Sequence, residues 1–306
     1  MTTPTPTSDT TNSVSTNSDV WSRQASTYAS MMLTGPMMTL ITRMYTHMAT
    51  LRPFSTATTV LDVGCGPGSA TLALINDHAE SLAPTTRIVA SDFSAGMVAQ
   101  VRALRERKLA ELDDANADGV AGQARQLWQQ LEAEVWNAQD LSAVPDASVS
   151  HYIASLVLFM LPDASLGLGE AHRVLEPGGV MSCSSWKHVS WMDLAMEARG
   201  KRASDFKLPQ KWAEAESVRT LLEEAGFEDV VVEEVRTYMN VENAELTAAW
   251  FFGRETPMAA LIQGMEEEER VQAMANLEKL FRKRKDPETG GVPGEGIVAT
   301  GRKRGD

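Results

Sequence analysis

Apolar residues between positions 58 and 186 fall into short strand-like runs separated by stretches with helical spacing. The strand-like runs are 58–63, 87–92, 133–137, 150–157 and 180–186, and the helical stretches are 69–80, 95–130 and 165–175. Polar residues at 113–122 break the second helical stretch. Strands that alternate with helices are typical of a mostly parallel sheet covered by helices, so the pattern predicts an α/β fold with a doubly wound sheet.

Segments with helical spacing of apolar residues also lie before and after this core. Residues 21–51 are rich in Met, Leu and Thr, and Gly35-Pro36 is expected to divide them into two helices. The later pattern predicts a helix at 214–225, a strand at 229–238, helix over 244–280 and a last strand at 294–302. We expect a single domain over 20–306, with lid helices at 20–57, a core at 58–192, and 193–306 completing the sheet with a helical lid insertion near 244–285.

Composition narrows the class of protein. The chain has 306 residues, is 43% hydrophobic and contains no apolar run long enough for a membrane span, so we expect a globular protein that does not enter a membrane. A formal net charge of −13 repels phosphate backbones, which makes a small molecule a better candidate ligand than nucleic acid. Residues 1–19 are mostly Thr, Ser, Asn and Pro and read as a disordered tail without features of a signal peptide.

The cysteine content bears on metal binding and on the cellular compartment. Cys65 and Cys183 are the only two cysteines, which is too few for a disulfide scaffold or a cysteine-built metal site. We therefore expect a cytoplasmic protein without a bound metal ion.

A glycine-rich turn follows the first strand-like run. Residues 60–68 read VLDVGCGPG, with glycine at 64, 66 and 68. Glycine is needed where the chain turns sharply with positive φ and where a ligand must lie against the backbone. The helix that follows offers unpaired N–H groups to a negatively charged or polar ligand. Dinucleotide sites prefer G-x-G-x-x-G, whose third glycine position is Ser69 here, so this turn disfavours a nicotinamide oxidoreductase.

An acidic residue ends the second strand-like run. Asp92 closes the run 88–92 and should lie beside the glycine turn, where it can accept hydrogen bonds from both hydroxyls of a ribose. Asp92 could instead cap the helix that begins near Ser94. The glycine turn upstream favours the ribose role.

These features resemble the class I S-adenosylmethionine-dependent methyltransferases. The resemblance covers most of 60–186 and includes RVLEPGG at 173–179. Within the superfamily the chain looks like the group of ubiquinone and menaquinone methyltransferases. It is most similar to fungal gliotoxin-type thiomethyltransferases and related natural-product enzymes, through Ser184-Ser185-Trp186 followed by Trp191, and the runs 137–140 and 295–298. The resemblance implies a seven-stranded Rossmann-like sheet and S-adenosylmethionine as cofactor, with S-adenosylhomocysteine as product.

The family pattern also assigns cofactor contacts in this chain. Its positions for the methionine part fall on Tyr28, Asp62, Gly64, Cys65, Gly66, Ser155 and Leu156. Its positions for the ribose and the adenine fall on Asp92, Phe93, Met97, Asn137 and Ala138. The family usually has aspartate where Asn137 stands, although an amide oxygen can also accept from the adenine amino group. Cys65 is expected to be a small turn residue and not a nucleophile, because no neighbour in sequence lowers the pKa of its thiol.

The reaction that the resemblance implies is in-line methyl transfer. A thiol acceptor is partly ionised at neutral pH and can react by positioning alone, whereas a phenol or an acidic carbon gains more from a general base. No catalytic residue stands out, and His188 after the fifth strand is the best-placed candidate base. Aromatic and apolar residues expected to wall the acceptor pocket are Met32, Phe159, Trp186 and Trp191.

Absent motifs narrow the acceptor. Residues 155–159 read SLVLF, which lacks the Asp/Asn-Pro-Pro-Tyr/Phe motif of the exocyclic-amine methyltransferases of DNA and RNA. We therefore predict a small-molecule methyltransferase of secondary metabolism, with a natural-product thiol as the favoured acceptor. O-, N- or C-methylation of an aromatic or polyketide metabolite stays open. So does a methyltransferase-like regulator that binds the cofactor and acts through a protein partner.

Overall fold

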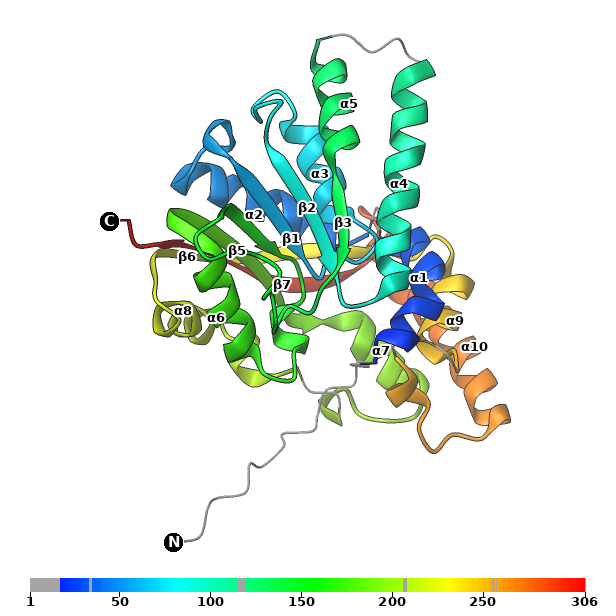
Figure 1. Ribbon diagram of the computed structural model, residues 1–306. Coiled ribbons are helices and arrows are strands. Elements are labelled where there is room, and N and C mark those ends of the chain that lie inside the picture. The colour runs from blue at the N-terminus through cyan, green and yellow to red at the C-terminus, as the bar shows by residue number, and fades with distance from the viewer. Residues whose placement is uncertain are drawn as a thin grey trace, which may run out of the picture.

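A single mixed β-sheet forms the centre of the computed structural model, which describes residues 17–305 except 33–34, 115–118, 206–207, 255 and 257 (Figure 1). The sheet has seven strands in the order β3-β2-β1-β4-β5-β7-β6. Their bounds are β1 Thr59–Val63, β2 Arg87–Asp92, β3 Glu132–Val135, β4 Val149–Ala154, β5 Leu175–Val189, β6 Phe227–Asn240 and β7 Gly291–Lys303.

The strand order creates a switch point between β1 and β4. The chain runs outward from β1 to β2 and β3, and then returns to place β4 on the other side of β1. These strands and β5 are parallel, whereas β7 is antiparallel to both β5 and β6. In an open α/β sheet, ligands bind at the carboxyl ends of the strands where the order reverses. The predicted doubly wound, mostly parallel sheet is confirmed.

Helices surround the sheet. Their bounds are α1 Ser18–Met32, α2 Met37–Leu51, α3 Ser69–His78, α4 Ala95–Asp114, α5 Val120–Gln130, α6 Ala164–Val174, α7 Ser190–Ala198, α8 Ala215–Glu224, α9 Ala244–Phe252 and α10 Glu267–Arg284. Short 3₁₀ turns lie at 54–56, 158–160, 203–205, 210–212 and 259–262. The helix pair expected on either side of Gly35-Pro36 is present as α1 and α2. Within 95–130, the break that the polar residues predicted falls between α4 and α5.

Two differences from the expected pattern matter for the site. The fourth strand ends at Ala154 rather than at 157, because the chain turns at Leu156, whose φ is +59°. Helix α7 directly follows β5 and was not predicted, since its nine residues are too few for helical periodicity to stand out.

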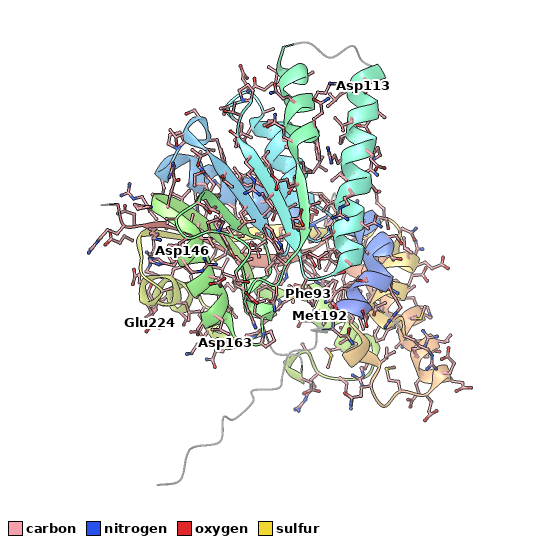
Figure 2. All side chains as sticks on the ribbon, in the orientation of Figure 1. Phe93, Asp113, Asp146, Asp163, Met192 and Glu224 are labelled. Carbon is pink, nitrogen blue, oxygen red and sulfur yellow. The ribbon has the colours of Figure 1, made fainter. Side chains whose placement is uncertain are left out.

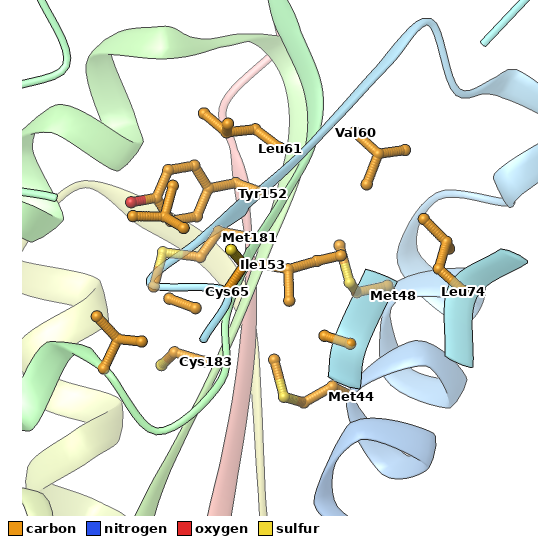
Figure 3. Packing of buried hydrophobic residues seen from close by; sticks show 14 of the residues in the cluster. Met44, Met48, Val60, Leu61, Cys65, Leu74, Tyr152, Ile153, Met181 and Cys183 are labelled. Carbon is orange, nitrogen blue, oxygen red and sulfur yellow. The ribbon is translucent and has the colours of Figure 1, made fainter. Parts of the chain in front are cut away.

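Residues of the main core alternate between the two faces of the sheet. Figure 3 shows Leu61 and Tyr152 on one side of β1 and β4, with Val60 and Ile153 on the other. Met44 and Met48 of α2, both fully buried, pack on the same side as Leu74 of α3. These two methionines are therefore core residues. A second core lies among α7, α9 and α10 and the adjoining ends of β6 and β7.

Among the helices of the described residues, none has the combination of length and apolar character that crossing a membrane requires.

Candidate active site

A cavity lies at the carboxyl ends of β1, β2 and β4, where the strand order reverses. It holds about 1130 Å³ of empty space, part of it open to solvent. Figure 2 shows Phe93, which lines the cavity, near one end of α4, and Asp113 near the opposite end. The cavity therefore lies at the N-terminal end of α4.

All twelve residues predicted to contact the cofactor line this one cavity. They are Tyr28, Asp62, Gly64, Cys65, Gly66, Asp92, Phe93, Met97, Asn137, Ala138, Ser155 and Leu156. They come from α1, from the segments after four strands and from the first turn of α4, so the fold gathers positions that are up to 128 residues apart, from 28 to 156.

The glycine turn has the geometry that its sequence predicts. Gly64, Gly66 and Gly68 all have positive φ, at 60°, 54° and 95°. A Cβ at Gly64 would lie 2.4 Å from a methyl carbon of Val157, so no side chain fits there. A Cβ at Gly66 would meet only the Tyr28 ring, at 3.9 Å, and would project into the cavity. Glycine at 66 thus leaves the backbone open to a ligand.

Asp92 joins the glycine turn to the start of α4. Its Oδ2 accepts a hydrogen bond from the Gly66 N–H at 3.0 Å, and its Oδ1 accepts one from the Ser94 N–H at 2.9 Å. Burial raises the pKa of Asp92 to about 6, against the effect of these two hydrogen bonds. Ser94 Oγ, and not Asp92, accepts from the Met97 N–H in the first turn of α4. The carboxylate of Asp92 keeps lone pairs for a ligand, because each oxygen can accept more than one hydrogen bond.

Asp62 presents an unsatisfied carboxylate oxygen. Its Oδ2 accepts from the Thr71 N–H at 3.1 Å and from the Thr71 hydroxyl at 2.7 Å. Its Oδ1 is buried and has no hydrogen-bond partner. Burial raises the pKa of Asp62 to about 7, the Thr71 hydrogen bonds oppose the rise, and nearby Asp92 adds to it. Asp62 lines the cavity, and its buried, unpartnered carboxylate oxygen fits a ligand ammonium group.

The turn after β4 is held by the neighbouring strand. Leu156, with its positive φ, donates its N–H to Ser184 Oγ of β5 at 3.0 Å, and the hydroxyls of Ser155 and Ser184 lie 3.4 Å apart. A non-glycine residue in this conformation is strained, and such strain concentrates at functional sites. Ser184 thereby fixes the segment that faces the methionine end of the predicted site.

The predicted adenine end of the site includes a polar side chain, Asn137, and an aromatic one, Phe93. Asn137 Oδ1 accepts from the Gln139 N–H at 3.0 Å, so the amide oxygen expected to meet the adenine already holds a local turn. Phe93 is 38% exposed, which is unusual for a phenylalanine and leaves its ring available to a ligand.

The acceptor-pocket residues predicted from sequence lie elsewhere. Trp191 packs its ring on Gly294 of β7, where an added Cβ would lie 2.5 Å from the ring, and Trp186 meets Trp191 edge to face. Phe159 is buried in the main core, although its neighbour Met160 lines the cavity. None of the three aromatic residues is among those described around the cavity, so their role at the acceptor stays a prediction. Met32 ends α1, and its side chain lies outside the described part of the structure.

His188 also lies away from the cavity. Its side chain is 52% exposed and pairs with Asp193 at 3.1 Å, with the Ser190 hydroxyl 3.3 Å away. The residues described around the cavity do not include it. The geometry therefore gives no support to His188 as a general base.

Half of the cavity lining was not identified from the sequence. These residues are Trp21, Met37, Ile41, Pro67, Ser69, Ala70, Trp136, Gln139, Val157, Met160, Leu161 and Pro162. Trp21 precedes Tyr28 by two helical turns and shares its face, so helical spacing could have identified it. Met37 and Ile41 could not be found in this way, because only the packing of α2 places them there.

In the described part of the chain, no group of three or more His, Cys, Asp or Glu side chains is arranged to hold a metal ion.

Comparisons with known proteins agree with this geometry. Residues 61–183 match the family described as a methyltransferase domain. Methyltransferase ucsB of an Acremonium species is 28% identical over 222 residues, which cover 72% of this chain and 73% of the relative. The acetylaranotin bis-thiomethyltransferase of Aspergillus terreus is 25% identical over 129 residues, which cover 39% of this chain and 42% of that enzyme.

A solved structure extends the likeness to the whole fold. A chain from the complex of a methyltransferase with a methyltransferase activator of Haloferax volcanii superposes with a TM-score of 0.50 at 17% identity, covering 94% of this chain and 96% of that one. The domain match spans the glycine turn, Asp92, strands β2 to β4 and parts of β1 and β5, and this segment contributes most of the cavity lining. The chain thus contains a methyltransferase domain over residues 61–183, and its similarity to known methyltransferases supports an enzyme with S-adenosylmethionine as its cofactor.

Proposed function

We propose that the enzyme methylates the thiol of a small, uncharged, largely apolar natural product. Oxygen, nitrogen and carbon acceptors rank behind sulfur. The observation that carries the proposal is the scarcity of proton-accepting groups among the residues described around the cavity.

The titratable side chains described around the cavity are Tyr28, Asp62, Cys65 and Asp92. Burial raises the pKa of the Tyr28 phenol and of the Cys65 thiol well above their usual values, so both stay protonated at neutral pH. Asp62 and Asp92 are the groups that hold the cofactor in this proposal. An acceptor that ionises by itself suits such a site, and a thiol is a few per cent thiolate at neutral pH.

Charge and polarity constrain the rest of the acceptor. The described lining contains two carboxylates and no lysine or arginine. An acceptor that carries a carboxylate or phosphate would be repelled and would leave its charge unpaired. Met37, Ile41, Met160 and Leu161 contribute apolar surface, which favours an apolar body around the reacting atom.

Different groups of the protein bind different parts of the cofactor. When bound, S-adenosylmethionine supplies a methyl group on a positively charged sulfur that is already activated for transfer. Asp62 accepts from the amine of the methionine part, and Asp92 accepts from the ribose hydroxyls. The backbone at Gly64 and Gly66 allows close approach, and Phe93 with Met97 flanks the adenine. Tyr28 and Trp21 of α1 help to exclude water.

The similarity to the thiomethyltransferase of Aspergillus terreus supports sulfur as the acceptor atom. A methyltransferase-like regulator would also bind the cofactor, but it would not form S-adenosylhomocysteine with small acceptors. Turnover therefore separates the two functions.

A pH profile with two acceptors tests the proposal. We expect log(kcat/KM) for an apolar monothiol to rise with pH up to the pKa of that thiol in solution, and to shift by the same amount when a more acidic thiol is used. The hydroxyl analogue of the same scaffold should react far more slowly. His188→Ala should keep thiol methylation within about tenfold, because solvent can take the proton.

Two results would count against this account. With S-adenosylmethionine saturating at every pH, a profile governed by one enzyme pKa and unchanged between the two thiols would indicate a protein general base. A loss of a hundredfold or more in His188→Ala would identify that base as His188.

A further inference from the structure

Helix α1 forms one wall of the cofactor cavity. Trp21 and Tyr28 both line the cavity, and their rings meet edge to face with centroids 5.3 Å apart. Trp21, Ala25 and Met97 form a small apolar cluster of their own, with Tyr28 packed against it. Figure 1 shows α1 against the end of α4 that lies at the cavity. The helix is thus anchored on the first turn of α4 and not within the sheet.

Polar contacts fix α1 at this position. Ser22 Oγ accepts a hydrogen bond from the Gly96 N–H at 3.1 Å and lies 2.8 Å from Ser94 Oγ. Ser94 in turn donates its N–H to Asp92, which accepts from Gly66. A continuous chain of hydrogen bonds therefore joins the wall helix to the carboxylate assigned to the ribose.

Gly96 allows this close approach. A Cβ at Gly96 would lie 2.5 Å from Ser22 Cα and 2.6 Å from the Ser22 carbonyl oxygen. The clash would be with backbone atoms, so α1 itself would have to move. Within a helix, glycine is otherwise less favourable than alanine by about 1 kcal/mol. The glycine at this helical position is explained by the docking of α1.

We propose that Ser22 and Gly96 form a latch that holds α1 over the bound cofactor and limits the rate at which the cofactor and its product leave. Ser22 is a positioning residue, since it acts by placing Trp21 and Tyr28. The latch closes when Ser22 meets the first turn of α4 and opens when those hydrogen bonds break. Cofactor exchange requires the open state.

The proposal rests on the cofactor assignment of the cavity and goes beyond it. If the latch limits release, weakening it should speed dissociation more than it slows association, because association starts from the open state. We expect Ser22→Ala to raise the dissociation rate of S-adenosylhomocysteine by about tenfold, the effect of losing one or two net hydrogen bonds. Gly96→Ala should raise this rate at least as much, because the added Cβ would displace the Ser22 backbone and so break the same hydrogen bonds. The two changes disrupt one contact, so the double variant should release no faster than the faster single variant.

Two control variants match the latch variants: a serine replaced in the same helix, and a helical glycine replaced elsewhere. Ser30→Ala removes a hydroxyl from α1 that bonds only the Thr27 carbonyl oxygen. Gly169→Ala changes a helical glycine in α6 where an added Cβ meets nothing within 4 Å. Both controls should release S-adenosylhomocysteine at the unaltered rate.

The experiment is stopped-flow release of S-adenosylhomocysteine from the preformed complex, followed by tryptophan fluorescence, with melting temperatures measured in parallel. Faster release in both latch variants, with controls unchanged and no further gain in the double variant, supports the latch. Unchanged release in both variants, or additive effects in the double variant, would overturn it. Failure of the unaltered protein to bind S-adenosylhomocysteine would instead refute the cofactor assignment, and the latch with it.

Discussion

Asp62 is buried, and only one of its two carboxylate oxygens accepts hydrogen bonds. Its protonation state should therefore respond strongly to a bound cation. Its raised pKa, about 7, means that the ligand-free protein holds a proton there at pH 6 and has lost most of it at pH 8.5. A ligand ammonium beside the carboxylate favours the ionised form. We therefore expect binding of S-adenosylhomocysteine to release a proton at pH 6 and almost none at pH 8.5, with affinity falling as the pH drops below about 7.

Calorimetry in two buffers of different ionisation enthalpy measures this release. Most of the proton release should be absent in Asp62→Asn. Any release contributed by Asp92, with its pKa of about 6, should remain. Equal release at the two pH values would contradict the role of Asp62. The raised pKa of Asp62 also lowers the stability of the ligand-free fold as the pH rises from about 4 through 7. The loss should be smaller in Asp62→Asn, where only Asp92, with its pKa of about 6, still contributes to it.

Asp92 offers a second test at the residue scale. Replacing it with alanine removes a charged acceptor from the ribose and from the Gly66 N–H. We expect Asp92→Ala to weaken binding of S-adenosylhomocysteine by about 1 to 3 kcal/mol, measured by calorimetry. Asp163→Ala is the control, because Asp163 caps α6 and its loss should lower stability but leave affinity intact. Unchanged affinity in Asp92→Ala would remove it from the site.

Local sequence spacing was sufficient to identify Asp92 and the glycine turn, whereas Asp62 was assigned through the family resemblance. Asp62 and Asp92 lie at the carboxyl ends of β1 and β2, and the carboxyl ends of parallel strands meet at one edge of the sheet. The sequence indicated Ser184 only as part of the motif Ser184-Ser185-Trp186. Its hydrogen bond to Leu156 was not predicted, because that bond depends on how β5 pairs with β4. The contacts of Ser22 with Ser94 and Gly96 join residues 72 and 74 positions apart, and no pattern along the chain indicates them.

At the scale of elements, the packing of α7 on β7 explains why two tryptophans lie outside the cavity. The Trp191 ring occupies the space above Gly294, next to the second core. We expect Gly294→Ala to force the ring to shift and to destabilise the fold by about 1 to 3 kcal/mol, measured by urea unfolding.

Cofactor affinity should not change in the same variant, because neither residue lines the cavity. Gly169→Ala, in open space on α6, should not destabilise the protein. A Gly294→Ala protein that is as stable as the unaltered one but binds S-adenosylhomocysteine poorly would place Trp191 at the site after all.

The sequence predicted nearly every strand because apolar runs bounded by Gly, Pro and Asp are distinctive. It placed the Pro177-Gly178-Gly179 turn before the fifth strand, whereas the structure includes these residues in β5, beside an irregular pairing with β4. A bulge of this kind depends on the partner strand and is not visible in one strand's own sequence. The antiparallel β7 likewise brings residues more than a hundred positions away against β5.

At the scale of the whole molecule, the sheet supplies the cofactor site and the added helices shape the rest of the cavity. Residues from β1, β2 and β4 fall within the segment that matches the methyltransferase domain, whereas Trp21, Tyr28, Met37 and Ile41 come from helices before it. We propose that acceptor selection resides in these N-terminal helices. The cofactor could be predicted through the family resemblance, whose motifs lie at strand ends. The acceptor could not, because its pocket depends on how helices pack.

The most direct test of the account is mass-spectrometric detection of methylated product. The purified protein would be incubated with S-adenosylmethionine and a panel of apolar thiols, dithiols, phenols, quinols and amines, including a reduced epipolythiodioxopiperazine. We expect the gain of one or two methyl groups on thiols, with stoichiometric S-adenosylhomocysteine and little product from the oxygen analogues. Methylation confined to phenols, amines or carbon acids, or cofactor binding without any turnover across the panel, would contradict the proposed thiol methyltransferase.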